Sequence, residues 1–408
     1  MPAWEQRKFG DCFEFLKSNT LSRAGLNGEN GTARNVHYGD ILIKFGDCLD
    51  GERSDLPFIT DDTVLPKFAG SILREGDVIF ADTAEDEAAG KCVELRKLPK
   101  EPTISGLHTI PARPRFFFGT GYLGHYLNSD AYHRQLLPLM QGIKVISVSK
   151  AALQDTQVRF PGLSEQAAIG AALSEIDNLI TLHQRKYDKL VILKKSMLEK
   201  MFPKDGESVP EIRFAGFTDP WEQRKLEDIA NRVTRKNEGE SDLPLTISSQ
   251  YGLVDQRTFF NNQVASKDMS GYYLLRKGEF AYNKSTSGDS PWGAVKRLVR
   301  YEKGCVSTLY ICFGLDGADP DFLVTYYETD RWYKAVQMIA AEGARNHGLL
   351  NIAPNDFFDT ALILPPSREE QELIGLFFAR LDNLITLHQR KLELLQNIKK
   401  SLLDKMFV

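Results

Sequence analysis

Two long stretches of the chain place apolar residues at alternating steps of three and four. The first runs from residue 164 to 202 and the second from 367 to 407. This spacing is the heptad pattern of a coiled coil, so it predicts one long helix in each stretch. Neither stretch has a second apolar face, and we therefore expect the two helices to pack on each other. The predicted seam positions are Ile169, Leu173, Ile176, Ile180, His183, Tyr187 and Leu190, and then Ile374, Phe378, Leu381, Ile385, His388, Leu392 and Leu395.

Charged residues indicate the direction in which these helices run. Each stretch begins with glutamates and ends with lysines, as the helix dipole favours. Antiparallel packing sets each acidic start beside the basic end of the partner, whereas parallel packing would place like charges together. We predict an antiparallel pair in which His183 and His388 lie close together. The pattern favours a polar seam residue at these positions, and the alternatives are a metal ligand or a pH switch.

The two halves of the chain repeat each other around these helices. Residues 177–186 recur letter for letter as residues 382–391, and Trp4-Glu-Gln-Arg-Lys8 recurs as Trp221-Glu-Gln-Arg-Lys225. Between tag and helix, each half carries a different segment of short β-type runs, Gly and Asp turns, and helical stretches. These features predict an α+β fold.

The predicted organisation is two tandem α+β domains separated by the two antiparallel helices, arranged about a pseudo-twofold axis. The two domains look like divergent copies of one fold, because short segments such as Gly76-Asp-Val-Ile-Phe80 align with Gly278-Glu-Phe-Ala-Tyr282. The predicted boundaries are 1–163 for the first domain, 164–202 for the central helix, 203–366 for a linker and the second domain, and 367–408 for the C-terminal helix.

Composition excludes several classes of protein. The apolar content of 42% and charged content of 26% are typical of a globular protein. No apolar run approaches the roughly 20 residues of a membrane span, and we expect no secretory signal. The five cysteines form no C-x-x-C pair, which argues against zinc or a disulfide framework and favours a reducing cytoplasm. With a net charge of −4, any binding of nucleic acid must use local basic patches.

Three segments of the chain are specific enough to compare with known families. They are Pro210-Glu-Ile-Arg-Phe-Ala-Gly-Phe217 before the second tag, the paired ten-residue helix segments, and Pro365-Pro-Ser-Arg-Glu-Glu-Gln371. Through them the whole chain resembles the specificity subunits of type I restriction-modification enzymes. One departure is that Trp4 lacks the Phe-Ala-Gly-Phe lead-in that precedes Trp221, so the natural start could lie upstream or the first half could be shortened.

The resemblance implies a protein that recognises DNA without chemistry of its own. Two target-recognition domains would each read one half of a split double-stranded DNA sequence, and the helices would hold the domains apart and dock two modification subunits. Adenosylmethionine, ATP and magnesium would be bound only by the modification and restriction subunits. We therefore expect no catalytic residue, no metal and no cofactor in this chain.

Two loops of the second half have the residue types that read base edges and phosphates. Either loop could instead be an ordinary solvated turn. The first loop follows a β-type run and leads into two cations. The second loop is flanked by glycines, and its arginine suits guanine while its asparagine suits adenine. The candidate residues are Asn283, Lys284, Ser285, Thr286, Ser287, Lys296 and Arg297 for the first loop, and Arg345, Asn346 and His347 for the second.

The corresponding loop of the first half, residues 82–91, is acidic. Acidic side chains repel phosphate but can accept hydrogen bonds from the amino groups of bases, and the alternative is a charged surface turn. Because the loops of the two halves differ, we expect the two half-sites to differ in sequence. The candidate residues of the first half are Asp82, Thr83, Lys91, Arg113 and Lys144.

Residues 117–124 offer a rival, enzymatic interpretation. They match both the F-x-G-x-G pattern of adenosylmethionine sites and a dinucleotide fingerprint. Those patterns require a parallel βαβ unit, and no Asn/Asp-Pro-Pro-aromatic motif follows, so methyl transfer by this chain alone is not expected. Another alternative is a stand-alone DNA-binding module or a scaffold that binds proteins.

Overall fold

The computed structural model divides the chain into two compact units. Unit 1 comprises Met1–Arg185 and Gln389–Val408, and unit 2 comprises Lys186–His388. Both units mix helix and sheet. Among the described residues, no helix combines the length and apolar character that crossing a membrane requires. The residues that the structure describes are 4–52, 56–248, 251–260, 266, 268–288, 290–340 and 348–407.

Unit 1 is built on a five-stranded sheet. Its order is β2 (Phe13–Phe15), β11 (Thr109–Pro114), β7 (Val78–Ala81), β9 (Cys92–Arg96) and β5 (Cys48–Asp50). The first four strands are antiparallel, and β5 is parallel to β9. The central strand β7 is buried on both faces: Val78 and Phe80 enter one apolar cluster, while Ile79 and Ala81 enter another. Alternation of side chains along a strand explains this division.

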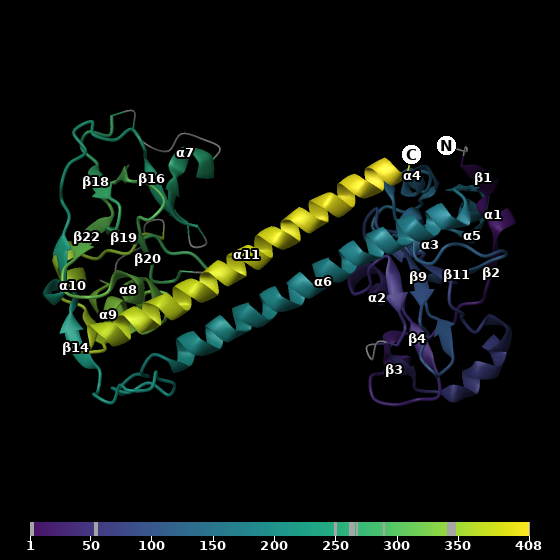
Figure 1. Ribbon diagram of the computed structural model, residues 1–408, viewed down its shortest axis with the longest axis horizontal. Coiled ribbons are helices and arrows are strands. Elements are labelled where there is room, and N and C mark those ends of the chain that lie inside the picture. Colours follow the sequence, from purple (N-terminus) through teal and green to yellow (C-terminus); the bar gives the residue numbers. More distant parts are fainter. Residues whose placement is uncertain are drawn as a thin grey trace. The chain divides into compact units, whose positions relative to one another are not determined.

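The other elements of unit 1 surround that sheet (Figure 1). A four-stranded sheet has the order β10 (Thr103–Ser105), β4 (Arg34–Val36), β6 (Phe58–Ile59) and β3 (Leu26–Asn27), and β8 (Thr83–Ala84) pairs with β12 (Ile146–Ser147). The α-helices are α1 (Phe9–Cys12), α2 (Tyr38–Ile43), α3 (Tyr122–Leu127), α4 (Asp130–His133) and α5 (Lys150–Asp155). The 3-10 helices are η1 (Arg23–Gly25), η2 (Asp62–Ser71) and η3 (Leu137–Leu139).

Unit 2 has a four-stranded antiparallel sheet. Its order is β15 (Ala230–Arg232), β22 (Ile311–Leu315), β19 (Phe280–Asn283) and β20 (Ala294–Arg297), which repeats the chain order of β2, β11, β7 and β9. Two further pairs are β16 (Leu245–Ser248) with β17 (Gly252–Asp255) and β18 (Tyr273–Arg276) with β21 (Lys303–Val306). The helices are η4 (Leu226–Asp228), α7 (Gln256–Phe259), α8 (Pro320–Tyr326), α9 (Tyr333–Ile339) and α10 (Pro354–Phe358).

The repeated sequence tags form strands next to the long helices. β1 (Glu5–Lys8) pairs antiparallel with β13 (Gln157–Phe160), and β14 (Glu222–Lys225) pairs in the same way with β23 (Ala361–Leu364). Each partner strand runs almost directly into a long helix. The tag therefore forms hydrogen bonds with the strand that leads into the helix. This contact explains why the tag and the helix are repeated together, while the residues between them differ.

The long helices are α6 (Leu163–Lys200) and α11 (Arg368–Met406), drawn in teal and yellow in Figure 1. In unit 2, Lys194 contacts Asp382 at 2.5 Å, and the later residue Phe202 contacts the earlier residue Phe378 with ring centroids 6.2 Å apart. In unit 1, Asp177 contacts Lys399 at 2.6 Å. Within unit 2, the later residue 202 is thus close to 378 and the earlier residue 194 is close to 382. The predicted antiparallel direction is therefore confirmed.

Every predicted seam residue is buried or half-buried. The coiled-coil pairing of each seam position stays a prediction. The approach of His183 to His388 and the pseudo-twofold axis would involve both units, and they also stay predictions.

Each long helix begins on its domain through the same glutamine and glycine. Gln166 Oε1 accepts a hydrogen bond from the Gly119 N–H at 2.8 Å, and its Nε2 donates to the Pro161 carbonyl at 2.8 Å. Gln371 makes the equivalent bonds with the Asp319 N–H and the Pro365 carbonyl, both at 2.8 Å.

A glycine one turn further along each helix allows the backbones to touch. A Cβ on Gly170 would lie 2.3 Å from the Thr120 carbonyl oxygen, and a Cβ on Gly375 would lie 2.6 Å from the Phe322 nitrogen. The repeated Gln and Gly are therefore docking residues.

Replacing Gly170 or Gly375 with alanine should destabilise the protein. The added Cβ has to push backbone away from backbone, which costs about 1 to 3 kcal/mol by the usual scale of overpacking. Urea unfolding of each variant measures this cost. Gly28→Ala is the control, because no atom lies within 4 Å of its added Cβ. Equal stability of all three variants would contradict the docking role.

Candidate nucleic-acid interface and its helical frame

The predicted reading loop of unit 2 follows strand β19 and is held by its own backbone. The Thr286 N–H donates to the Gly348 carbonyl at 2.6 Å, and the Thr286 hydroxyl donates to the same carbonyl at 3.0 Å. Asn283 Oδ1 accepts from the Ser285 N–H at 3.1 Å. Ser285 and Ser287 remain exposed. Hydrogen bonds thus hold the loop in a turn, and Ser285 and Ser287 are accessible to solvent.

The cations near this loop already have protein partners. Lys284 Nζ donates to the Ile352 carbonyl at 3.3 Å, and burial lowers the pKa of this lysine. Arg297 pairs with Asp321 at 2.8 Å, while Lys296 Nζ lies 3.9 Å from a Glu328 oxygen. A DNA phosphate would have to compete with these carboxylates. Arg345, Asn346 and His347 lie outside the described residues.

Two basic residues of unit 1 that were predicted to bind DNA form hydrogen bonds within the domain. Lys91 Nζ donates to the carbonyls of Leu42 and Phe45 at 3.1 and 2.9 Å, and burial lowers its pKa. Arg113 forms two hydrogen bonds with the buried Asp77, at 2.9 and 2.8 Å, and the hydrogen bond with Asp77 raises the pKa of the guanidinium. Both groups thus have internal acceptors with which a DNA phosphate would have to compete, and their contact with phosphate stays a prediction.

The predicted acidic residues lie beside a hairpin in which Lys144 is exposed. Asp82 is half-buried and accepts a hydrogen bond from the Thr83 hydroxyl at 2.7 Å. Thr83 pairs with Ser147 across β8 and β12, and the backbones of Gln141 and Ser147 exchange hydrogen bonds of 3.0 and 2.8 Å. This bonding closes the tip that carries Lys144.

The same tip presents an apolar residue that the sequence interpretation missed. Ile143 is 99% exposed, in spite of being a large aliphatic side chain. The bridge between Ser285 and Leu349 occupies the equivalent place in unit 2. Ile143 and Lys144 therefore correspond, along the chain, to positions shortly before Leu349. Aligning the two halves of the sequence would have identified Ile143.

A groove of about 930 Å³ lies in unit 1 between the sheet and helix α6. Its wall carries both signs of charge, including Arg74, Lys97 and Glu75, and the exposed Phe117 stands at it. Arg96, also in this wall, donates to the Ser174 hydroxyl of α6 at 2.9 Å. Mixed charge of this kind does not single out DNA.

The glycine-rich residues 117–124 lie in a setting that differs from a dinucleotide-binding loop. The preceding strand β11 is antiparallel to both of its neighbours, so the required parallel βαβ unit is missing from this part of the described chain. Glu94 accepts from the N–H groups of Gly121 and Gly124 at 2.6 and 2.9 Å. Donors that would cradle a phosphate are therefore bound to a carboxylate. Close contact also explains Gly124, whose Cβ would lie 2.3 Å from the Asp47 carbonyl oxygen.

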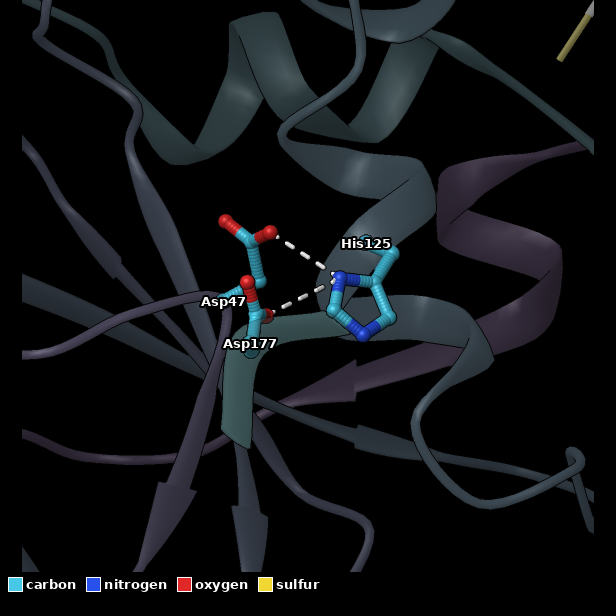
Figure 2. Close-up of side chains that lie close together, drawn as sticks. All are labelled: Asp47, His125 and Asp177. Atoms are coloured by element: carbon cyan, nitrogen blue, oxygen red, sulfur yellow. Dashed lines mark hydrogen bonds and ion pairs between the residues drawn. The ribbon is translucent and has the colours of Figure 1, made fainter. Parts of the chain in front are cut away.

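A partly buried cluster of ionisable side chains contacts both long helices in unit 1, and Figure 2 shows three of its members, Asp47, His125 and Asp177. His125 Nδ1 lies 2.9 Å from Asp47 and 3.8 Å from Asp177 of α6. Lys399 of α11 contacts both carboxylates at 2.6 Å. The imidazole is fully buried.

The electrostatics of this cluster keep its ion pairs charged. Burial alone would raise the pKa of Asp47, but the His125 hydrogen bond and the Lys399 charge lower it below the usual value. Burial would lower the pKa of Lys399, and the two carboxylates raise it above the usual value.

The ligand atoms of Asp47, His125 and Asp177 lie within 4.8 Å of one another, close enough to hold a metal ion. However, the Lys399 ammonium already forms ion pairs with both carboxylates. The chain itself thus supplies the cation that such a site needs, which favours a structural role.

Unit 2 contains a matching cluster. Lys194 of α6 contacts Glu328 at 2.7 Å and Asp382 of α11 at 2.5 Å. In the sequence repeat, Lys194 corresponds to Lys399 and Asp177 corresponds to Asp382, with an offset of 205 positions in each case. Burial and the nearby Glu328 raise the pKa of Asp382, and the carboxylates raise that of Lys194 in spite of burial.

Aromatic residues cover the end of each helix in the same way. Phe407 packs on Trp4 and Tyr122, with ring centroids 6.3 and 5.8 Å away. Its repeat equivalent Phe202 packs on Trp221 and Phe322, at 5.7 and 5.8 Å. The two tags therefore supply the tryptophans that receive the helix ends.

Comparisons with known proteins show which proteins this chain is similar to. No family model matches the chain. A type I restriction enzyme MjaX specificity subunit of Methanocaldococcus jannaschii is 24% identical over 230 residues, which are 55% of this chain and 52% of that protein. The chain thus spans about half the length of the curated relative it matches.

Solved structures extend the comparison to the whole fold. The type I restriction-modification S subunit from M. genitalium is 12% identical and aligns over 99% of this chain and 96% of its own, with a TM-score of 0.59. The chain has the fold of a type I restriction-modification specificity subunit. The HsdS subunit from Thermoanaerobacter tengcongensis aligns over 100% and 97% at 16% identity, with a TM-score of 0.43. The resemblance first seen in the repeated segments is thus confirmed for the fold, and the curated relative has the same description.

In this specificity-subunit fold, Lys399→Met or Lys194→Met should cost about 3 kcal/mol of stability. Each change leaves two partly buried carboxylates without their cation, and breaking such a pair from one side is destabilising. Urea unfolding measures the loss. Lys405→Met is the control, because Lys405 is exposed near the end of the same helix. A loss no larger than that of the control would show that neither cluster holds its helix.

Proposed function

We propose that this chain is the DNA sequence-specificity subunit of a type I restriction-modification complex. The observation that carries the proposal is the repeated architecture: each unit has the same four-strand order and receives the start of one long helix and the end of the other. Each unit would read one half of a split double-stranded target. The two corresponding loops differ, with exposed Ser285 and Ser287 in unit 2 and exposed Glu85, Asp86 and Glu87 in unit 1, which supports an asymmetric target.

Repeated apolar residues on the helices support two modification subunits as partners. Leu179 and Leu182 of α6 are 36% and 46% exposed, and their equivalents Leu384 and Leu387 of α11 are 44% and 46% exposed. The sequence around them is identical. Two copies of one exposed surface fit two copies of one partner, because an identical surface presents an identical docking site. Restriction subunits would join the same assembly.

We further propose that this chain is not an enzyme and that it binds no cofactor or metal. Adenine methylation with adenosylmethionine and ATP-dependent cleavage with magnesium would belong to the partner subunits. Two features support this proposal: the Gly121 and Gly124 donors are bound to Glu94, and Lys399 forms ion pairs with both carboxylates of the Asp47, His125 and Asp177 cluster. A cytoplasmic location is proposed because all five cysteines are unpaired thiols.

The second candidate is a scaffold whose units bind protein, which is compatible with the net charge of −4. Binding of duplex DNA that weakens steeply with salt separates the two functions, since release of counterions from phosphates produces that slope. Absence of salt-dependent binding by the assembled complex would favour the scaffold.

Replacing Lys144 with alanine should weaken DNA binding about equally across sequences. Loss of one phosphate contact reduces the slope of log affinity against log salt by about 1. Fluorescence anisotropy at several salt concentrations, with the complete complex, provides the measurement. Lys100→Ala is the control for an exposed lysine of the same unit. If the Lys144 and Lys100 variants have the same slope as the parent, the hairpin is not a phosphate contact.

Replacing Leu182 and Leu387 together with glutamate should weaken the docking of modification subunits by roughly 100-fold. A buried charge at the centre of an apolar contact costs on the order of 2 to 4 kcal/mol. Titration of the chain with purified modification subunit in an analytical ultracentrifuge follows the loss. Ile43→Glu is the control, because Ile43 is 86% exposed and lies on α2. Unchanged assembly of the double variant would exclude the leucine faces as the interface.

A further inference from the structure

His108 is an exposed residue with an unusual backbone conformation, in the turn before strand β11. Its φ of 53° lies in the left-handed region, which glycine adopts readily and other residues adopt rarely. The side chain is 48% exposed, so burial of the ring does not explain why a histidine occupies this position. A residue other than glycine pays a free-energy cost in this conformation, and residues of this kind cluster at functional sites.

The turn that carries His108 is bound to the predicted reading loop of unit 1. The Asp82 N–H donates to the His108 carbonyl at 3.0 Å. In the side chain, Nδ1 lies 3.3 Å from an Asp82 carboxylate oxygen and 3.5 Å from the Thr83 hydroxyl. That hydroxyl also donates to Asp82 at 2.7 Å, and the Tyr38 ring packs edge to face on the imidazole with centroids 5.3 Å apart. These contacts fix the orientation of the imidazole.

The imidazole keeps one nitrogen available for a ligand. Both polar contacts that the ring makes with described residues use Nδ1. A carboxylate can only accept hydrogen bonds, so Asp82 favours the proton on Nδ1 and leaves Nε2 of the neutral ring as an acceptor. In the major groove of DNA, the base groups that donate to such an acceptor are the amino groups of adenine and cytosine. The ring is thus arranged to recognise one of these two bases.

Unit 2 has different residues at the equivalent positions. The aligned strands β7 and β19 pair with β11 and β22 in the same register, which makes Leu309 the counterpart of His108. The same alignment makes Lys284 the counterpart of Asp82. Leu309 is 57% exposed, and Lys284 donates to the Ile352 carbonyl at 3.3 Å. An exposed residue thus occupies the same place in both units, and its character changes from polar to apolar, as the reading of different bases requires.

We propose that His108 is a base-reading residue of unit 1, held by the positioning residue Asp82, and that it recognises an adenine or a cytosine of the half-site. This inference rests on the proposed function. It also gives Asp82 a specific role, because the carboxylate acts on the base through the imidazole. A base contact from a ring of fixed orientation specifies one position of the half-site, whereas a phosphate contact carries no sequence information directly.

Selection of bound duplexes from a randomised library, with the complete complex, tests the proposal. Sequencing of the bound pool gives the base preference at each position of both half-sites. His108→Gly removes the ring and supplies a residue suited to a φ of 53°, so the chain should be at least as stable in urea unfolding. The preference for adenine or cytosine at one position of one half-site should fall roughly tenfold. All other positions should keep their preferences.

Lys97→Gly is the matched control for the change of backbone. Lys97 is also exposed, belongs to the same unit and has a φ of 46°. Its replacement should leave stability equal or higher, as with His108→Gly, and should leave the preference at every position unchanged. Equal losses of preference in the two variants would overturn the proposal. So would a His108→Gly chain that is less stable and binds all sequences more weakly, because that result indicates a structural role.

Asp82→Asn tests the positioning role. The amide no longer favours the proton on Nδ1, so the preference at the position read by His108 should weaken, by a smaller factor than with His108→Gly. Because the carboxylate acts through the ring, the double variant should lose no more preference than His108→Gly alone. Losses that add up, or a loss at a different position, would contradict this role of Asp82.

The outcomes separate this inference from the proposed function. If the parent complex selects a split sequence and the His108→Gly complex selects it with the same preferences, the inference fails while the proposed function stands. A preference lost for guanine or thymine would also overturn the inference. If the parent complex selects no sequence, the proposed function fails, and the inference fails with it.

Discussion

The fold depends on holding two long helices that have only one apolar stripe each. A helix of this kind cannot form a compact core by itself, so its stability must come from tertiary contacts. Each helix has them at both ends. At the start, a glutamine and a glycine dock it on the domain that precedes it, and at the end a phenylalanine enters an aromatic cluster of the other unit. The remaining repeated residues provide the charges that lock this arrangement.

Those charges are arranged so that each lysine bridges two carboxylates from different parts of the chain. Lys399 joins α11 to α6 through Asp177 and to the domain through Asp47, and Lys194 joins the equivalent elements of unit 2. Partial burial makes these pairs costly to break from one side, although their net contribution relative to apolar packing is modest. Their main effect is therefore to set where each helix lies on its domain.

The domains carried by this frame are alike in strand order and different in the residues they present. The shared part is the four-strand sheet and its flanking helices, whose side chains are buried and therefore constrained by packing. The variable part is the turn after the central strand and the segment that pairs with it. The proposed recognition of two different half-sites fits this division, since base contacts come from exposed loops while a buried sheet holds the loops in place.

The sequence by itself determined the long helices, their antiparallel direction and the repeated frame. Heptad spacing, terminal charges and a letter-for-letter repeat are patterns that one can see without knowing which distant residues meet. It did not determine the roles of single polar residues. Lys91 and Arg113 have the right charge for a phosphate, but no sequence pattern indicates their internal partners, which are the carbonyls of residues 42 and 45 and the carboxylate of Asp77. The glycine-rich residues 117–124 had the spacing of a cofactor loop, yet they seat helix α6.

Only the tertiary structure could decide these cases, because the decisive partners are far apart in the chain. Lys399 and Asp47 are separated by 352 positions, and neither has a local pattern that points to the other. A polar side chain can form hydrogen bonds with many different residues. Only the folded structure determines which of these residues is its partner. Apolar periodicity, in contrast, is a local consequence of helix geometry, and for that reason it could be interpreted directly from the sequence.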